Sequence, residues 1–177
     1  MTKQPTQKIT VNFRTLSVWD KLVYSLGVGL GSGLFPKAPG TMGSLAVLLL
    51  VPLWLWLGIT ATFIVIVVMS VLGVWICDRT AEIMQVHDDA RIVWDEFAGQ
   101  SIVLLPLMWF DQMNWLGILL AFGLFRLFDI WKPWPIGYAD RQLKGGFGIM
   151  MDDILAGIIA AAVLYAGLIM TMGYVGI

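Results

Sequence analysis

Long apolar runs alternate with short polar segments along this chain. A helix needs about 20 mostly apolar residues to cross a bilayer, with about 17 as a lower limit. Five runs approach or reach that length when the third is extended back to Ile92: residues 43–58, 60–77, 92–110, 115–131 and 154–173. This pattern predicts an all-α, polytopic membrane helix bundle with about five hydrophobic helices.

The first apolar run, residues 20–35, is too rich in glycine for an ordinary spanning helix. Glycines alternate at 27, 29, 31 and 33, and each disfavours a helix by about 1 kcal/mol relative to alanine. We predict a re-entrant or interfacial helix, with close packing of small residues against a neighbour as the alternative. Residues 1–19 are polar and basic and lack the apolar core of a signal peptide, which predicts an uncleaved segment ahead of one integral-membrane domain over 20–177.

Composition supports the membrane class. Hydrophobic residues make up 59% of the 177 residues and charged residues 13%, against about 45–50% and about 25% in globular domains. The net charge of −1 gives no reason to expect a nucleic acid partner. The single cysteine, Cys77, cannot form an internal disulfide or a cysteine metal cluster.

Charge placement predicts the topology. When the loop at 58–60 and the break at 111–114 are put outside, all eleven Lys and Arg residues face the opposite side, which the positive-inside rule makes cytoplasmic. Eleven of the twelve acids join them, Asp111 being the exception. The N-terminus is then cytoplasmic and the C-terminus outside. Because the middle of each run is nearly free of polar groups, this arrangement disfavours a transporter and favours chemistry at the cytoplasmic interface.

Two polar segments at this interface hold candidate binding groups. In FPKAPGTMGS, residues 35–44, Gly40, Thr41 and Ser44 open a helix whose N–H groups and hydroxyls suit an anion; an ordinary loop with Thr41 as N-cap is the alternative. In HDDARIVWDE, residues 87–96, the adjacent Asp95 and Glu96 border an uncharged run. Attraction by the helix dipole, about 0.3–1 kcal/mol, is too small to offset two such charges.

Two further segments add charges at the same level. Arg126, Asp129 and Lys132 are spaced three apart and share a helix face. One interpretation is therefore a ladder of ion pairs in which these three side chains satisfy one another. Pro133, however, disfavours helix at Lys132. In DRQLKGGFGIMMDD, residues 140–153, a pliable glycine loop precedes Asp152 and Asp153 at the start of the last helix.

The negative charge of the carboxylates in these segments must be neutralised. Like charges a few Å apart cannot all stay ionised in a poorly hydrated site, so either several are protonated or cations lie among them. Oxygen ligands with few His and no Cys select a hard cation, Mg²⁺ or Mn²⁺. Metal together with an anion site at headgroup depth indicates phosphoryl chemistry on a phospholipid.

The same segments resemble the membrane phosphatidylglycerophosphatase A family, between about residues 29 and 160. The matching pieces are GSGLFPKAPGTMGSL, VHDDARIVWDEFAG, FRLFDIWKPWPI and GGFGIMMDDILAG. The resemblance implies a Mg²⁺-dependent phosphatase of the bacterial inner membrane that converts phosphatidylglycerophosphate to phosphatidylglycerol and phosphate at the cytoplasmic leaflet. Lys37, Asp78, Glu82 and Asp89 lie outside the family's pattern and receive no role.

The resulting hypothesis assigns a role to each candidate residue. One or two Mg²⁺ ions are shared by five carboxylates, those of Asp95, Glu96, Asp129, Asp152 and Asp153. Phosphate oxygens are held by Lys132 and Arg141, with Gly40, Thr41 and Ser44 completing the anion site. His87 or Asp88 acts as general acid or base. Attack by water and a covalent phospho-aspartate both stay open.

Two other classes of function remain. A phosphatidyl- or glycosyl-lipid transferase also pairs acids, metal and lipid phosphate, and it would depend on a second alcohol or a nucleotide substrate. A cation-binding membrane protein or transporter without enzymatic activity would show metal binding or flux and no turnover.

Overall fold

The structure is a computed structural model that describes residues 11–86 and 89–174. These residues form the helices α1 (Val18–Gly27), α2 (Pro39–Leu48), α3 (Val51–Met84), α4 (Trp94–Trp109), α5 (Trp115–Trp131), α6 (Ile136–Gln142) and α7 (Gly145–Tyr174), with 3₁₀ helices η1 (Phe13–Thr15) and η2 (Gly29–Leu34). The described part of the chain contains no strand, so the all-α prediction is confirmed.

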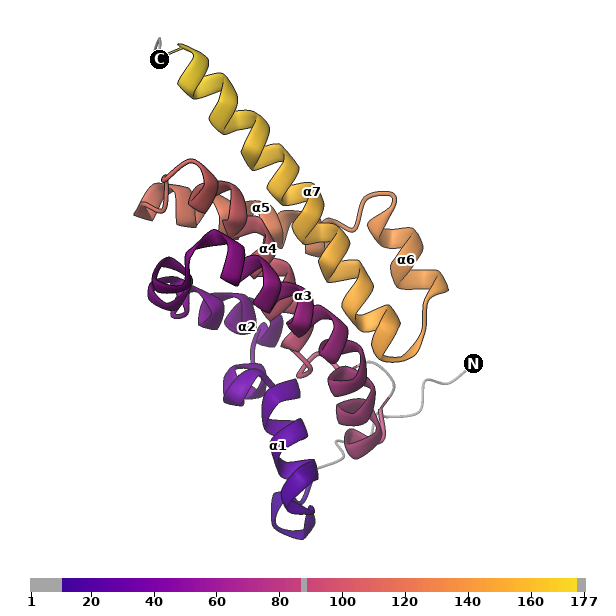
Figure 1. The fold of residues 1–177 in the computed structure, drawn as a ribbon. Coiled ribbons are helices and arrows are strands. Elements are labelled where there is room, and N and C mark those ends of the chain that lie inside the picture. Colours follow the sequence, from indigo (N-terminus) through magenta and orange to yellow (C-terminus); the bar gives the residue numbers. More distant parts are fainter. Residues whose placement is uncertain (1–10, 87–88, 175–177) are drawn as a thin grey trace.

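Helix α4 lies at the centre of the bundle. It packs against α2, α3, α5 and α7, and most of its side chains from Glu96 to Leu107 are buried. Helix α7 runs obliquely from the C-terminal end to the side that carries α6, which lies beside its first turns, and α1 lies at the opposite end of the molecule from the C-terminus (Figure 1). The core where α4, α5 and α7 meet is filled by apolar side chains, among them Leu104, Phe125 and Ala156.

The number of spanning helices differs from the prediction. Within the described residues, two helices are long and apolar enough to cross a membrane, α3 and the Gly145–Thr171 part of α7; the prediction of about five is wrong. Helix α4 has 16 residues, or about 24 Å at 1.5 Å per residue, against a hydrocarbon core of about 30 Å. Its apolar sequence is explained by the burial of most of its side chains within the protein.

The run at 43–58 does not form one helix. Helix α2 ends at Leu48 and α3 begins at Val51, with Pro52 in the first turn of α3. Because proline has no N–H to donate to the carbonyl four residues earlier, Pro52 disfavours the continuation of α2 and suits the first turn of a new helix. The expected break near 58–60 is confirmed as a kink, since Gly58 takes a left-handed φ of 75° inside α3.

The glycine-rich N-terminal run also forms only a short helix. Helix α1 has ten residues, about 15 Å in length, and η2 follows it with left-handed backbone at Leu30 and Gly31. Such a segment is too short to cross a bilayer. Gly27 lies directly against the side chain of Thr80 in α3, so close packing of a small residue occurs as well. An interfacial position for α1 stays a prediction.

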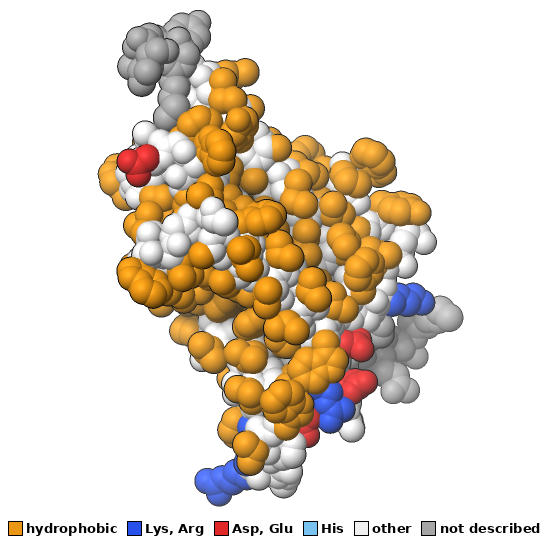
Figure 2. All heavy atoms as spheres, in the orientation of Figure 1, with side chains coloured by type: hydrophobic (Ala, Val, Ile, Leu, Met, Phe, Trp, Pro, Cys, Tyr) orange, Lys and Arg blue, Asp and Glu red, His pale blue; other side chains and the backbone are white. Residues whose placement is uncertain are grey.

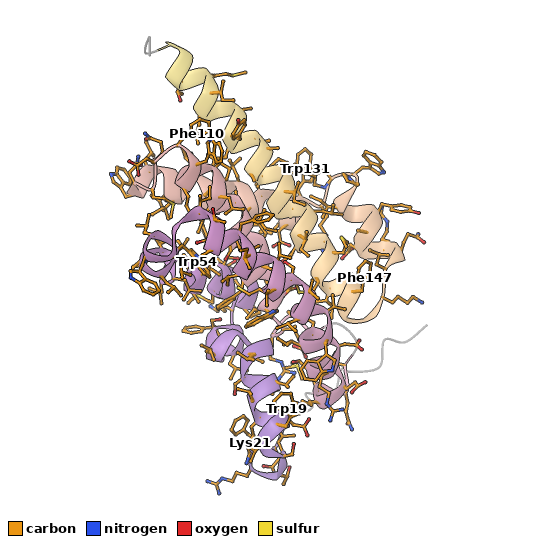
Figure 3. The ribbon with its side chains drawn as sticks, in the orientation of Figure 1. Trp19, Lys21, Trp54, Phe110, Trp131 and Phe147 are labelled. Carbon is orange, nitrogen blue, oxygen red and sulfur yellow. The ribbon has the colours of Figure 1, made fainter. Side chains whose placement is uncertain are left out.

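The surface supports association with a membrane. Hydrophobic side chains cover most of the face shown in Figure 2, and most of its visible charged side chains lie along the lower right edge, with one acidic side chain at the upper left and a basic one at the lower left tip. Trp54 is buried inside the bundle, whereas Trp131 and Phe147 project at the side of the molecule that carries α6 (Figure 3). Apolar area of this extent is unusual on a soluble monomer.

A close approach of α4 and α7 brings the starts of these two helices together. A Cβ added to Gly157 in α7 would lie 2.5 Å from the carbonyl oxygen of Gly99 in α4. Only glycine fits such a crossing without moving a helix. Because Asp153 precedes Gly157 by one helical turn, the crossing fixes the distance between Asp153 and the carboxylates at the start of α4.

We therefore expect Gly157→Ala to destabilise the protein by about 1–3 kcal/mol, as overpacking does elsewhere, and to lower its activity. Gly167→Ala on the same helix is the matched control, since no atom lies within 4 Å of the added Cβ and alanine is the better helix former. Thermal unfolding in detergent measures both variants. Equal stability of the two would contradict the close-packing account.

Candidate active site

A cavity of about 710 Å³ opens where α2 begins, α4 begins, α5 ends, and α6 and α7 meet. Its charged lining side chains come from segments that are distant in the sequence and that the sequence pattern had singled out: Asp89, Asp95, Glu96, Arg126, Asp129, Lys132, Asp140, Arg141, Lys144, Asp152 and Asp153. The predicted convergence of four polar segments is thus present in the fold.

Three carboxylates form the core of the cavity. Asp95 and Glu96 lie in the first turn of α4 and Asp153 near the start of α7, and one oxygen from each lies within 4.8 Å of the others. Glu96 is 9% exposed and Asp153 3%. Asp95 Oδ1, Glu96 Oε2 and Asp153 Oδ2 are buried and accept no hydrogen bond from the described residues.

An arginine lies beside this cluster. Arg126 Nη1 in α5 is 2.5 Å from Asp129 Oδ2 one turn later and 3.9 Å from Glu96 Oε1. The same nitrogen donates to Ser44 Oγ at 3.4 Å. Arg126 Nε is buried and has no acceptor among the described residues.

Lys132 lies on the side of the cavity formed by α6 and α7. Lys132 follows the last residue of α5 with left-handed backbone, and its Nζ lies 2.5 Å from Asp140 Oδ1 in α6 and 2.6 Å from Asp152 Oδ2 in α7. Burial alone would lower the pKa of Lys132, but the hydrogen bonds to Asp140 and Asp152 outweigh it and raise this pKa. Lys132 therefore stays positively charged throughout the physiological pH range.

The predicted ladder of ion pairs along Arg126, Asp129 and Lys132 is present in part. Arg126 and Asp129 pair along one face of α5 as their spacing indicated. Lys132 instead turns away to α6 and α7, because the helix ends ahead of Pro133.

The start of α2 forms a third side of the cavity. Gly40 and Thr41 line it, and the Gly40 backbone lies against both Glu96 and Arg126, so that a Cβ there would contact Glu96 Oε1. Ser44 lies behind the lining: it is fully buried and donates to Gly40 O at 3.0 Å. Arg141 is exposed at the cavity mouth.

The remaining candidates divide into two groups. His87 and Asp88 lie outside the described residues, so their predicted roles stay predictions. Of the acids given no role, Asp78 accepts the N–H of Gly146 and caps α7, and Glu82 pairs with Arg79. Asp89 lines the cavity, but Arg91 occupies both of its oxygens, and the hydrogen bond from Arg91 lowers the pKa of Asp89.

Sequence reasoning missed three lining or buried residues. Arg126 had been considered only as part of the ladder, and Asp140 had not been considered at all. Gln100 is fully buried one turn after Glu96, and neither end of its amide has a partner in the described chain. An isolated glutamine inside an apolar run was a signal that could have identified it.

The arrangement suits a hard divalent cation. Clustered carboxylate oxygens are the ligands that Mg²⁺ and Mn²⁺ prefer, and buried carboxylate oxygens without hydrogen-bond donors are otherwise costly. Asp95, Glu96 and Asp153 could hold such an ion. Carboxylates, half-buried basic side chains and a helix start around one cavity suit an enzyme that acts on phosphate esters.

The chain belongs to the phosphatidylglycerophosphatase A family, whose model matches residues 25–168. It is 47% identical over 143 residues to an Escherichia coli phosphatidylglycerophosphatase A, covering 79% of this chain and 80% of that one. It is 48% identical over 145 residues to the Haemophilus influenzae protein of that name, covering 81% and 87%. A Bacteroides thetaiotaomicron relative, provisionally named a phosphatidylinositol-3-phosphatase, is 39% identical over 138 residues, covering 75% and 85%.

The chain is therefore an enzyme, a phosphatase that acts on a phosphate monoester. No solved structure matches it.

Proposed function

We propose that this chain hydrolyses phosphatidylglycerophosphate to phosphatidylglycerol and inorganic phosphate, with Mg²⁺ or Mn²⁺, at the cytoplasmic face of a bacterial inner membrane. One observation carries the proposal: three carboxylates, each with a buried and unpartnered oxygen, meet in one cavity, in a chain closely similar to two proteins named for this activity.

The carboxylates divide by their surroundings. Asp95, Glu96 and Asp153 have free oxygens and would hold the ion. Asp129 and Asp152 are bonded to Arg126 and Lys132, although Asp152 Oδ1 is also buried without a partner among the described residues, and they complete the ligand set or orient it. When bound, Mg²⁺ lowers the pKa of a coordinated water and shields the negative charge of the phosphate.

The phosphate-binding side uses the groups opposite the carboxylates. The backbone at Gly40 and Thr41 offers N–H groups from the start of α2. Lys132 uses two of its three N–H donors on Asp140 and Asp152, so one remains for a phosphate oxygen. Arg141 at the mouth meets the outer oxygens or the headgroup, and Ser44 supports the Gly40 backbone from behind.

Hydrolysis needs one proton acceptor and one proton donor. The oxygen of water attacks phosphorus, the bond from phosphorus to the glycerol oxygen breaks, and the leaving alkoxide takes a proton. A cavity carboxylate oxygen that does not hold the ion, such as the second oxygen of Asp95, can take the proton of the attacking water. His87 or Asp88 is the proposed donor to the alkoxide. A phospho-aspartate remains the alternative course.

The cavity lining supports a lipid substrate. Ile130, Leu143 and Ile149 lie among the charged residues, and Trp131 and Trp134 are exposed beside them. Tryptophan is enriched at membrane–water interfaces. A phosphate bound to the polar side of the cavity thus leaves its acyl chains next to apolar side chains and lipid.

The experiment is product analysis with purified protein in detergent micelles. With Mg²⁺ we expect phosphatidylglycerol and inorganic phosphate in equal amounts. Soluble glycerol 3-phosphate should give a kcat/KM lower by at least about tenfold, because it lacks the binding energy of the lipid. Turnover only with a second alcohol or a nucleotide would indicate a transferase, and Mg²⁺ binding without turnover would indicate a cation-binding protein; either result would contradict the proposal.

A further inference from the structure

The arginine on the cavity wall has more hydrogen-bonding capacity than the protein uses. Arg126 is only 15% exposed in its side chain. Its hydrogen bond and ion pairs with described residues, to Ser44, Asp129 and Glu96, are all made by Nη1. A guanidinium has five N–H donors, and Nη1 carries two of them, so the Nε–H and both Nη2–H groups have no acceptor among these residues.

The unused donors have a defined geometry. Nε–H and one Nη2–H point in parallel from one edge of the planar guanidinium, and this edge matches two oxygens of a phosphate. Arg126 Nε is also buried, and a buried N–H without an acceptor is destabilising. An acceptor supplied by a ligand would satisfy it.

The position of the arginine matches the place where a phosphate must lie. Glu96 belongs to the carboxylate cluster and also lies 3.9 Å from Arg126 Nη1. A Cβ on Gly40 at the start of α2 would be 3.3 Å from the same nitrogen. Arg126 thus stands between the proposed metal ligands and the proposed anion site.

The other cations of the cavity are less suited to this task. Lys132 is bonded to two carboxylates, and Arg141 and Lys144 are exposed at the mouth. To neutralise the negative charges of Asp129 and Glu96, any positive charge would do, and lysine provides one as well as arginine. Arginine differs in offering two parallel N–H donors on one edge of its guanidinium.

We propose that Arg126 is a catalytic residue that donates its Nε–Nη2 edge to two non-bridging oxygens of the phosphate, in the substrate and as charge develops during hydrolysis. The inference rests on the proposed function and adds to it a residue that the sequence pattern had assigned to a ladder. It predicts that arginine, and not merely a cation, is required at position 126.

The test compares Arg126→Lys and Arg126→Gln with the wild type. Calorimetry in detergent measures the Kd for inorganic phosphate in the presence of Mg²⁺, and the Kd for Mg²⁺ in phosphate-free buffer. We expect phosphate binding to weaken at least about tenfold in both variants and Mg²⁺ binding to change less than about threefold. The kcat should fall about 10²–10³-fold in Arg126→Gln, as when one oxyanion donor is removed. Lys37→Gln, an exposed residue outside the lining, is the control of equal charge change.

The measured affinities distinguish a phosphate-binding role of Arg126 from a structural one. Unchanged phosphate affinity in Arg126→Lys would overturn it. Parallel loss of Mg²⁺ and phosphate binding, or failure of both variants to fold, would assign Arg126 to holding the carboxylates in place and would overturn it as well. If the wild type binds phosphate but releases none from the lipid, the proposed function fails, while the phosphate affinities of the variants still test Arg126.

Discussion

Asp153→Asn is expected to lower kcat by at least about 10²-fold while the protein stays folded. Asp153 has a buried oxygen with no partner in the described chain and lies within 4.8 Å of oxygens from Asp95 and Glu96. Removal of a group that merely supports a metal ligand costs about 10–100-fold, so the loss of a ligand should cost at least the upper end of that range. Asparagine has nearly the same volume, and α7 therefore keeps its packing. Phosphate release from the lipid measures the effect.

The matched control for this substitution is Asp111→Asn. Asp111 is exposed between α4 and α5, outside the cavity lining, and its left-handed φ of 55° is a backbone conformation that asparagine tolerates well. Its kcat should change by less than about twofold, since surface substitutions have small effects. Full activity of Asp153→Asn, or equal effects of the two variants, would refute the role of the cluster.

Removal of the divalent ion should abolish activity and lower stability together. With excess chelator we expect phosphate release to fall to background, and added Mg²⁺ to restore it. Because an ion that binds only the folded state stabilises it, Mg²⁺ at 100 times its Kd should add about 2.7 kcal/mol to the free energy of unfolding. Thermal unfolding with and without Mg²⁺ measures this.

The same comparison in Asp153→Asn separates the cavity from other binding sites. The Mg²⁺-dependent rise in unfolding temperature should be absent or much reduced in this variant. Undiminished activity in chelator, or equal stabilisation of wild type and variant by Mg²⁺, would show that the ion is not bound at this cluster.

The sequence predicted which segments meet but not how their charges pair. Asp95, Glu96, Asp129, Asp152 and Asp153 could be found because carboxylates at the ends of apolar runs are costly without partners. The contact of Arg126 with Ser44 joins residues that are 82 positions apart. No local pattern encodes such a distance, and the capacity of Arg126 to bind a ligand became visible only from its contacts.

Helix lengths were the weakest part of the sequence prediction. Hydropathy does not distinguish a helix packed within protein from one surrounded by lipid, and most side chains of α4 are buried within the protein. At 43–58 the apolar composition suggested continuity, while Pro52 favours the break that the structure shows between Leu48 and Val51. The end of α5 at Lys132 was foreseen, because the residue before a proline avoids the helical region.

The central claim is that a divalent ion among Asp95, Glu96 and Asp153 makes the cavity a phosphatase site. Crystals of the active protein grown with Mn²⁺ in place of Mg²⁺ test this directly through anomalous scattering. We expect a Mn²⁺ peak within about 2.0–2.3 Å of oxygens from these three carboxylates, a normal bond length for such ligands. An enzyme that is active with Mn²⁺ but carries no Mn²⁺ in this cluster would contradict it.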